Sequence, residues 1–307
     1  MKNKLTLQDL LEVQQFFGLP SPALVEKDWY VVQALAAIAS IEAGPLRLVF
    51  GGGTALSRAH RLIRRMSEDV DLKIVAVNPA RAQLRALRDQ VTTALKDAGF
   101  EFDSMNRDHR NSQNETRYTI FRLPYEPNAA GEGVLKPTIQ IELALWPLLR
   151  PDVKLPVTSF VTEAVKGAPE VESIACVSVT QTAAEKFVAL TRRIAAQRAQ
   201  GGEHDATLLR HIYDLWAIRK HHDFVQTAGL IPALMQSDTE TFGKQFPEYR
   251  VNPVAETQRA LQALSADPDY SRQFALFQRD MVYGDKVEFG VAMRTLNELF
   301  EEVGKRG

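Results

Sequence analysis

Two aspartates, Asp69 and Asp71, stand two residues apart at the start of an apolar run. On a β-strand, residues i and i+2 project from the same face, so we expect both carboxylates to lie side by side. Carboxylate oxygens are the ligands that a hard ion such as Mg²⁺ prefers. A metal ion held there can bridge the oxygens of a triphosphate and activate an incoming nucleophile. We therefore predict that Asp69 and Asp71 bind a catalytic Mg²⁺ or Mn²⁺.

A third carboxylate, Glu142, is expected in the middle of a strand over residues 138–145. The alternate positions are aliphatic and predict the core face of that strand: Ile139, Ile141, Leu143 and Leu145. A carboxylate within such a strand is costly unless it is solvated, paired or bound to metal. We expect Glu142 to be a ligand of a second metal ion or the base that accepts the proton of an acceptor hydroxyl.

A glycine run, 51–53, follows the short apolar segment 46–50. Glycines let the backbone bend sharply and approach a ligand closely. The helix expected after them would offer free N–H groups and a partial positive charge, which favour phosphate. We predict that Gly52, Gly53 and Thr54 surround the phosphates of a nucleotide.

Ser67 precedes Asp69 by two residues, so the same strand geometry would direct its hydroxyl toward the triphosphate. Its simpler role is a local hydrogen bond to the backbone at the start of the strand. A glycine run or an Asp pair alone is weak evidence, because both are common in turns. The prediction depends on their combination in this order, with a mid-strand glutamate downstream.

The elements that must position these residues follow from apolar spacing and from Gly and Pro breaks. Helices are predicted over 5–17, 23–41, 54–65, 79–99, 181–198 and 206–220, with further helices to about 303. Strands are predicted over 46–50, 70–77, 100–102, 117–123, 138–145 and 175–179, with a loop over 124–133.

This order predicts an α/β fold with a small mixed sheet flanked by helices, followed by a helical C-terminal domain. We expect residues 1–150 to form the first domain and residues 151–307 the second. The nucleotide is expected in a cleft between the two domains.

Three further groups of ionisable residues have simple structural interpretations, and the first group also allows a functional one. Four arginines, Arg58, Arg61, Arg64 and Arg65, would contact the nucleotide or an RNA, or would form the solvated face of an amphipathic helix. The segment 26–28 (Glu-Lys-Asp) is most simply a charged face at a helix start. The histidines at 211, 221 and 222 are interpreted as helix-end residues rather than a metal site.

The composition is that of a globular protein, with 307 residues of which 45% are hydrophobic and 24% charged. The net charge of −1 provides no overall basic field for nucleic acid, although it leaves a local basic patch open. Cys176 is the only cysteine, which excludes an internal disulfide and a cysteine-rich zinc site. No signal sequence or membrane span is recognised, so a cytoplasmic protein is expected.

The sequence resembles the polymerase-β-type nucleotidyltransferase superfamily in its Gly-Gly-Gly-Thr run followed by Ser-x-Asp-x-Asp-Leu. Within that superfamily it resembles the AbiEii/AbiGii toxins. The residues that carry this closer resemblance span about 20–220: Glu26-Lys-Asp-Trp29, Ser67–Leu72, Glu185-Lys-Phe-Val-Ala-Leu190 and Arg210-His-Ile-Tyr-Asp-Leu215.

The resemblance implies a polymerase-β-like domain in which the Asp pair binds metal and a later Lys and Asp complete the site. By position these are Lys186 and Asp214. Lys186 would neutralise the phosphates, and Asp214 would orient Lys186 or bind ribose. Phe187 stands where Leu is common in the family, and Glu142 where Asp is usual. The resemblance also implies that the segment 26–28 packs near the active cleft. Without the resemblance, Lys186 would be interpreted as a surface lysine and Asp214 as the partner of Arg210 on a solvated helix face.

The resemblance further implies that the enzyme moves a nucleoside monophosphate from an NTP to an RNA hydroxyl, most plausibly on tRNA. Such an enzyme acts as a bacterial toxin and has a neutralising antitoxin as its partner. Two alternatives stay open: an antibiotic-type enzyme acting on a small molecule, and a non-catalytic nucleotide-binding protein. A basic rim formed by 58–65 and 192–198 would favour RNA, whereas an acidic pocket would favour a small molecule.

Overall fold

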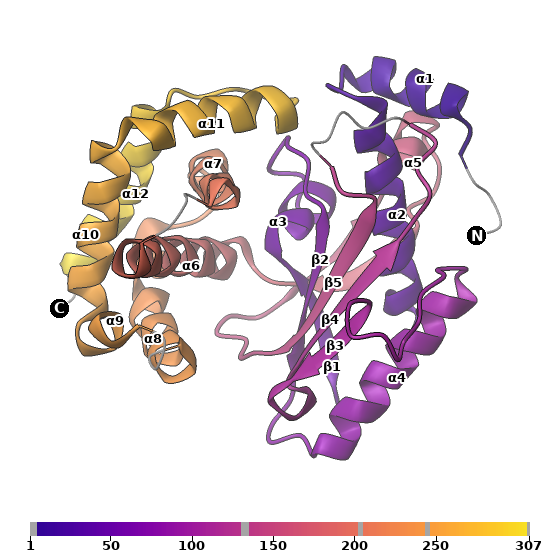
Figure 1. Cartoon of the computed structure of the whole chain (residues 1–307), viewed down its shortest axis with the longest axis horizontal. Coiled ribbons are helices and arrows are strands. Elements are labelled where there is room, and N and C mark those ends of the chain that lie inside the picture. The colour runs from indigo at the N-terminus through magenta and orange to yellow at the C-terminus, as the bar shows by residue number, and fades with distance from the viewer. Residues whose placement is uncertain (1–4, 130–134, 202–204, 243–245, 306–307) are drawn as a thin grey trace. The chain divides into compact units, whose positions relative to one another are not determined.

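The computed structural model describes residues 5–129, 135–201, 205–242 and 246–305 (Figure 1). The chain divides into two compact units, Met1–Val177 and Ser178–Gly307, which are described separately here. The first unit contains the sheet and its helices, and the second is helical throughout its described residues. The mixed α/β half and the helical half predicted from the sequence are therefore both present.

The first unit is built on a mixed sheet with the strand order β3-β4-β5-β2-β1-β7-β6. Its strands are β1 (Arg47–Gly51), β2 (Asp69–Val75), β3 (Arg110–Gln113), β4 (Tyr118–Pro124), β5 (Thr138–Leu145), β6 (Val153–Val157) and β7 (Val171–Cys176). Strand β2 runs antiparallel to β1 and parallel to β5. These two pairings place the glycine run and both predicted carboxylate strands in the middle of the sheet.

Alternation along β2 and β5 separates an apolar face from a polar one. Val70, Leu72 and Ile74 of β2 are buried, and the residues between them are partly exposed. Strand β5 repeats the pattern over Thr138–Leu145, the residues predicted for it. The buried side chains join those of α2 (Pro22–Ala39) and α4 (Arg81–Asp97) in one hydrophobic core. The opposite face is left for polar side chains.

Local signals set the first helices where the sequence predicts them. Helix α1 (Leu7–Phe17) starts with a capping box between Thr6 and Asp9. It ends at Gly18, whose φ of 62° is the left-handed conformation that glycine adopts at little cost. Ser21 then caps α2, which has Pro22 in its first turn.

The predicted strand at 100–102 is wrong. Phe100 and Phe102 are buried in the core, but the chain there forms no strand. Two strands and the short helix α5 (Phe160–Ala164) were not predicted. Strand β3 is polar throughout and β6 contains Pro156, and both lie at sheet edges, where the alternating pattern is weakest. Of the predicted loop 124–133, residues 125–129 are irregular as expected and 130–134 lie outside the described residues.

The helix predicted over 54–65 is much shorter than expected. Helix α3 (Gly52–Thr54) continues into one π-helical turn, Ala55–Ala59, and Arg61 then has a φ of +57°. A helix cannot continue through a left-handed residue. Arg58 and Arg65 are buried, so the solvated-face interpretation is wrong for both, although Arg61 and Arg64 are exposed.

The charged segment 26–28 is buried inside α2, which corrects the expectation of a charged surface at a helix start. Glu26, Lys27 and Asp28 are each at most 2% exposed. Glu26 accepts hydrogen bonds from the backbone N–H groups of Asn128 and Ala129, at 2.8 and 3.1 Å. The segment therefore ties α2 to distant parts of the chain.

Asp28 forms a buried ion pair. Its Oδ1 lies 2.6 Å from Nε of Arg58, and its Oδ2 accepts a hydrogen bond from the N–H of Phe160. The Arg58 guanidinium also lies over the Phe160 ring, 3.4 Å from its centroid. Burial raises the pKa of Asp28 to about 6 against the opposing effect of Arg58. Each charge therefore depends on the other for compensation.

The second unit consists of packed helices. They are α6 (Val179–Gln200), α7 (Leu209–Ile218), α8 (Phe224–Phe242), α9 (Pro247–Val251), α10 (Pro253–Ala266), α11 (Pro268–Met281) and α12 (Phe289–Gly304). Helix α6 packs against α7, α8, α9 and α10 (Figure 1). In the described residues, no helix is both long and apolar enough to cross a membrane.

The two compact units divide after Val177, because β6 and β7 extend the sheet of the first unit. Cys176, at the end of β7, is a free thiol with no exposed surface. Burial raises its pKa to about 12.

We expect Asp28→Asn to lower the free energy of unfolding by about 3 kcal/mol, because the Arg58 charge would stay buried without its carboxylate. The matched control is Glu163→Gln. Glu163 lies 3.8 Å from the same guanidinium, but its side chain is 39% exposed. The control should change stability by less than about 1 kcal/mol, as exposed pairs do. Urea denaturation measures both values, and equal effects would show that the Asp28 pair is not the buried link described here.

Candidate active site

The predicted carboxylates lie together on the polar face of the sheet. Asp69 and Asp71 alternate with buried residues of β2, so both project from the face opposite the core. In the parallel pairing with β5, Asp71 lies beside Glu142 and Asp69 beside Gln140. On the other side, Gly51 of β1 is directly opposite Asp71. The sheet therefore brings the glycine run, the Asp pair and the mid-strand glutamate to one place.

The glycine run is shaped around Asp71. Gly52 has a φ of +70°, in the left-handed region that favours glycine. A Cβ at this position would overlap Oδ2 of Asp71 and lie 2.7 Å from its Cγ. Position 52 therefore requires glycine for two reasons. One is the backbone angle, and the other is the space that the Asp71 carboxylate occupies.

Gly53 is enclosed by two side chains from the segment before β2. A Cβ there would lie 2.6 Å from Nη2 of Arg65 and 2.7 Å from Oγ of Ser67. The sequence predicted Ser67 near the phosphate site, and the structure places its hydroxyl against this turn. Arg65 is 3% exposed and donates to the carbonyl oxygen of Met66 at 2.6 Å. From the sequence, Arg65 had two interpretations, as a contact of the nucleotide or an RNA and as part of a solvated helix face. The structure places its guanidinium against the glycine turn.

Thr54 connects the turn to β2. Its hydroxyl donates to the carbonyl oxygen of Asp69, and the residue is 1% exposed. The sequence predicted a phosphate ligand at this position. In the structure, the hydroxyl donates to the backbone of Asp69, and the phosphate-binding role stays a prediction.

Glu142 is held by donors on its own face of the sheet. Gln140 donates to Oε1 of Glu142 at 2.8 Å, and the Tyr118 hydroxyl is a second hydrogen-bond partner. Burial raises the pKa of Glu142, and the hydrogen bond from Tyr118 opposes that shift. Sequence reasoning missed Tyr118. Its spacing of four residues from Arg122 along β4 could have placed both side chains on the same face of the sheet.

In the part of the chain that the structure describes, the candidate metal ligands on β2 are a pair of carboxylates. Among the described residues, no three His, Cys, Asp or Glu side chains come close enough together to hold one. Asp69 and Asp71 share one face of a rigid strand, and oxygen pairs of this kind suit Mg²⁺, which keeps other positions for water and phosphate oxygens. The other role predicted for Glu142, that of a proton acceptor, does not require a metal contact.

Lys186 and Asp214 form a buried ion pair in the second unit. Nζ of Lys186, on α6, lies 2.7 Å from Oδ2 of Asp214, on α7. The two side chains are 7% and 0% exposed, so the interpretation of both as surface residues is wrong. Of the two roles that the resemblance implies for Asp214, the geometry favours orienting Lys186.

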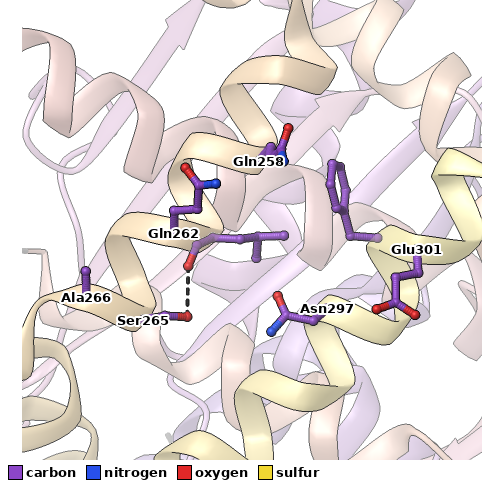
Figure 2. A pocket seen from close by; sticks show the side chains of 8 residues that line it. Gln258, Gln262, Ser265, Ala266, Asn297 and Glu301 are labelled. Carbon is purple, nitrogen blue, oxygen red and sulfur yellow. Dashed lines mark hydrogen bonds between the residues drawn. The ribbon is translucent and has the colours of Figure 1, made fainter.

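The second unit also contains a groove of about 540 Å³ between α10 and α12. Figure 2 shows Gln258, Gln262 and Ser265 on one helix, facing Asn297 and Glu301 on the other. None of the predicted site residues lines this groove.

Comparison with known proteins identifies the family. The model of the family described as "Nucleotidyl transferase AbiEii toxin, Type IV TA system" matches residues 33–302. The chain belongs to the AbiEii family. The match extends through the C-terminal helices, well beyond the motifs at 20–220, and it makes this chain a nucleotidyltransferase toxin of a type IV toxin–antitoxin system. The non-catalytic alternative is thereby excluded.

The fold has a counterpart among solved structures. MenT4, a nucleotidyltransferase toxin of Mycobacterium tuberculosis, matches with a TM-score of 0.50 and 16% sequence identity. The match covers 98% of this chain and 99% of MenT4. No curated protein sequence gives a significant match.

Gly52→Ala should displace the Asp71 carboxylate, and we expect nucleotidyl transfer to fall by about 100-fold, as small misplacements of reacting groups do. Gly44→Ala is the matched control, because Gly44 has a similar φ of +59° but nothing within 4 Å of its Cβ position. Both variants should lose about 1–2 kcal/mol of stability from the left-handed angle. Transfer rates and urea denaturation separate the two effects, and equal activities in both variants would rule out the Gly52–Asp71 contact.

Lys186→Ala should reduce kcat/KM for the NTP by about 100-fold, because it removes a fixed charge that counters the charge developing on the leaving pyrophosphate. Lys220→Ala is the control, since Lys220 is an exposed lysine just beyond α7. Steady-state kinetics with each variant tests the assignment. Wild-type behaviour of Lys186→Ala would remove the residue from the site.

Proposed function

We propose that this toxin transfers a nucleoside monophosphate from an NTP to a hydroxyl group of an RNA, in a reaction that depends on Mg²⁺ or Mn²⁺. The observation that carries the proposal is the placement of Asp69 and Asp71 on one strand face, against a glycine turn that leaves space for the Asp71 carboxylate. When bound, the metal ion neutralises phosphate charge and lowers the barrier to attack at phosphorus.

In the proposed reaction, the oxygen of the acceptor hydroxyl attacks the α-phosphorus, and the bond between that phosphorus and the leaving pyrophosphate breaks. Glu142 accepts the proton of the hydroxyl. Its raised pKa, caused by burial, makes it a better base than an exposed carboxylate. Tyr118 and Gln140 fix the direction of the carboxylate by donating to it.

The triphosphate is bound by groups that donate hydrogen bonds or carry positive charge. In the proposed site, the backbone N–H groups of Gly52 and Gly53 face the phosphates. Ser67 adds a hydroxyl beside the same turn. The family resemblance assigns a phosphate-neutralising role to Lys186, whose ammonium group is paired with Asp214. Thr54 contributes indirectly, by holding the backbone of Asp69.

The acceptor is proposed to be an RNA, and most plausibly a tRNA, on the strength of the family resemblance. The expected basic rim is a weaker argument than the sequence indicated, because Arg58 and Arg65 are buried. Arg192 is mostly buried as well, and it pairs with Asp238 at 2.7 Å. A small-molecule acceptor therefore stays the second candidate. An antitoxin is expected as partner, since the family belongs to a toxin–antitoxin system.

Asp69→Asn and Asp71→Asn should each abolish transfer while leaving stability unchanged or slightly higher, because two like charges no longer repel. Purified wild type and variants would be incubated with each labelled NTP, Mg²⁺ and total RNA, and label in RNA would be measured. Asp152→Asn is the control, as this aspartate is tied to Arg47 at the surface. Full turnover in excess chelator would contradict the metal mechanism, and label only in small molecules would favour the second candidate.

The same variants test toxicity. Expression of the wild type alone should slow bacterial growth, and expression of Asp71→Asn at equal level should not. Arrest by the inactive variant would show that growth inhibition is independent of nucleotidyl transfer.

A further inference from the structure

The ammonium group of Lys27 lies where the two carboxylate-bearing strands begin. Its Nζ donates to the carbonyl oxygens of Lys136 and Thr138, at 2.8 and 2.5 Å. It also lies 3.5 Å from Oε2 of Glu68. Lys27 is 1% exposed, so these partners account for a charge that is removed from solvent.

The positions of these partners along the strands are informative. Glu68 directly precedes Asp69, the first residue of β2. Thr138 is the first residue of β5 and lies four residues before Glu142. One cation therefore holds the starting points of both strands, and the side-by-side placement of Asp71 and Glu142 follows from where those strands begin.

A lysine at this point of α2 is not explained by packing alone. Burial lowers the pKa of Lys27, whereas Glu68 and Asp69 oppose that shift by favouring the charged form. An aliphatic side chain would fill the same interior without the cost of desolvation. The charge is useful only if its partners must be held in place.

We propose that Lys27 is a positioning residue that sets the carboxylate pair of β2 against Glu142 of β5, through Glu68 on one strand and the Thr138 carbonyl on the other. Lys27 does not touch the nucleotide. This inference rests on the proposed function, since it concerns the metal site assigned to Asp69 and Asp71.

A neighbour of Lys27 on α2, Glu26, provides a matched control. Glu26 is equally buried, but it binds the backbone of residues 128 and 129, which belong to neither carboxylate strand. Glu26→Gln should therefore weaken an anchor of α2 without disturbing the starts of β2 and β5. Any general effect of loosening the helix appears in both variants, and a positioning effect appears only when Lys27 is changed.

The test is Mn²⁺ binding by titration calorimetry in the presence of a non-hydrolysable NTP analogue, a measurement that requires no turnover. We expect Lys27→Met to bind Mn²⁺ about tenfold more weakly than wild type, the loss typical when an outer-shell partner is removed. Glu26→Gln should stay within about twofold of wild type. Lys27→Arg, which keeps the charge, should recover part of the loss. Where Lys27→Met does not fold, Glu68→Gln removes one contact of the same cation and should weaken binding about threefold.

Unchanged Mn²⁺ affinity in Lys27→Met and Glu68→Gln, relative to Glu26→Gln, overturns the positioning role while leaving the metal site intact. A wild-type protein that binds no Mn²⁺ overturns the proposed metal site itself and this inference with it. The two failures are therefore distinguishable in one set of titrations.

Discussion

The contact between Gly52 and the Asp71 carboxylate is the constraint on which the rest of the site depends. Strand β1 brings Gly51 directly opposite Asp71, and the left-handed turn at Gly52 then leaves the carboxylate the space of a missing side chain. Thr54 attaches the other end of the turn to the Asp69 carbonyl. These contacts join the strand, the glycine turn, the short helix and the aspartate strand into one motif. Each part of the motif limits where the next can lie.

Buried charged side chains connect this motif to the rest of the sheet and its helices. Helix α2 contributes three charged side chains to the interior, and Arg58 and Arg65 add two guanidinium groups near the turn. Such groups contribute little net stability, because desolvation offsets most of their attraction. Their geometric demands are strict, however, since a partner must lie at hydrogen-bond distance and in the right direction. Their effect is to favour one arrangement of the strands over others of similar compactness.

Residue patterns predicted the elements whose signal is local. Strand β5 was predicted at its observed bounds, and the alternation in β2 placed Asp69 and Asp71 on one face as observed. The edge strands β3 and β6 were missed because one is polar and the other contains proline. The π-helical turn before Arg61 was missed because spacing alone cannot distinguish it from the start of a longer helix.

The burial and pairing of charged residues were less predictable, because they depend on partners far along the chain. Lys27 donates a hydrogen bond to a carbonyl oxygen 109 residues away. Asp28 pairs with Arg58 and accepts a hydrogen bond from the N–H of Phe160. No window of local sequence contains both members of such a pair. The same reasoning applies to Lys186 and Asp214, which only the family resemblance singled out before the structure showed them paired.

The solitary thiol of Cys176 gives this protein a built-in reporter. It is fully buried at the end of β7, and its high pKa keeps it protonated at neutral pH, so the native state should be inert toward alkylating reagents. Modification would then record only those openings that expose β7, which lies between β1 and the edge strand β6, and its rate would report on those openings. The helical half contains no cysteine, so a single one introduced there would be labelled selectively, and the two halves could be followed independently in the same molecule.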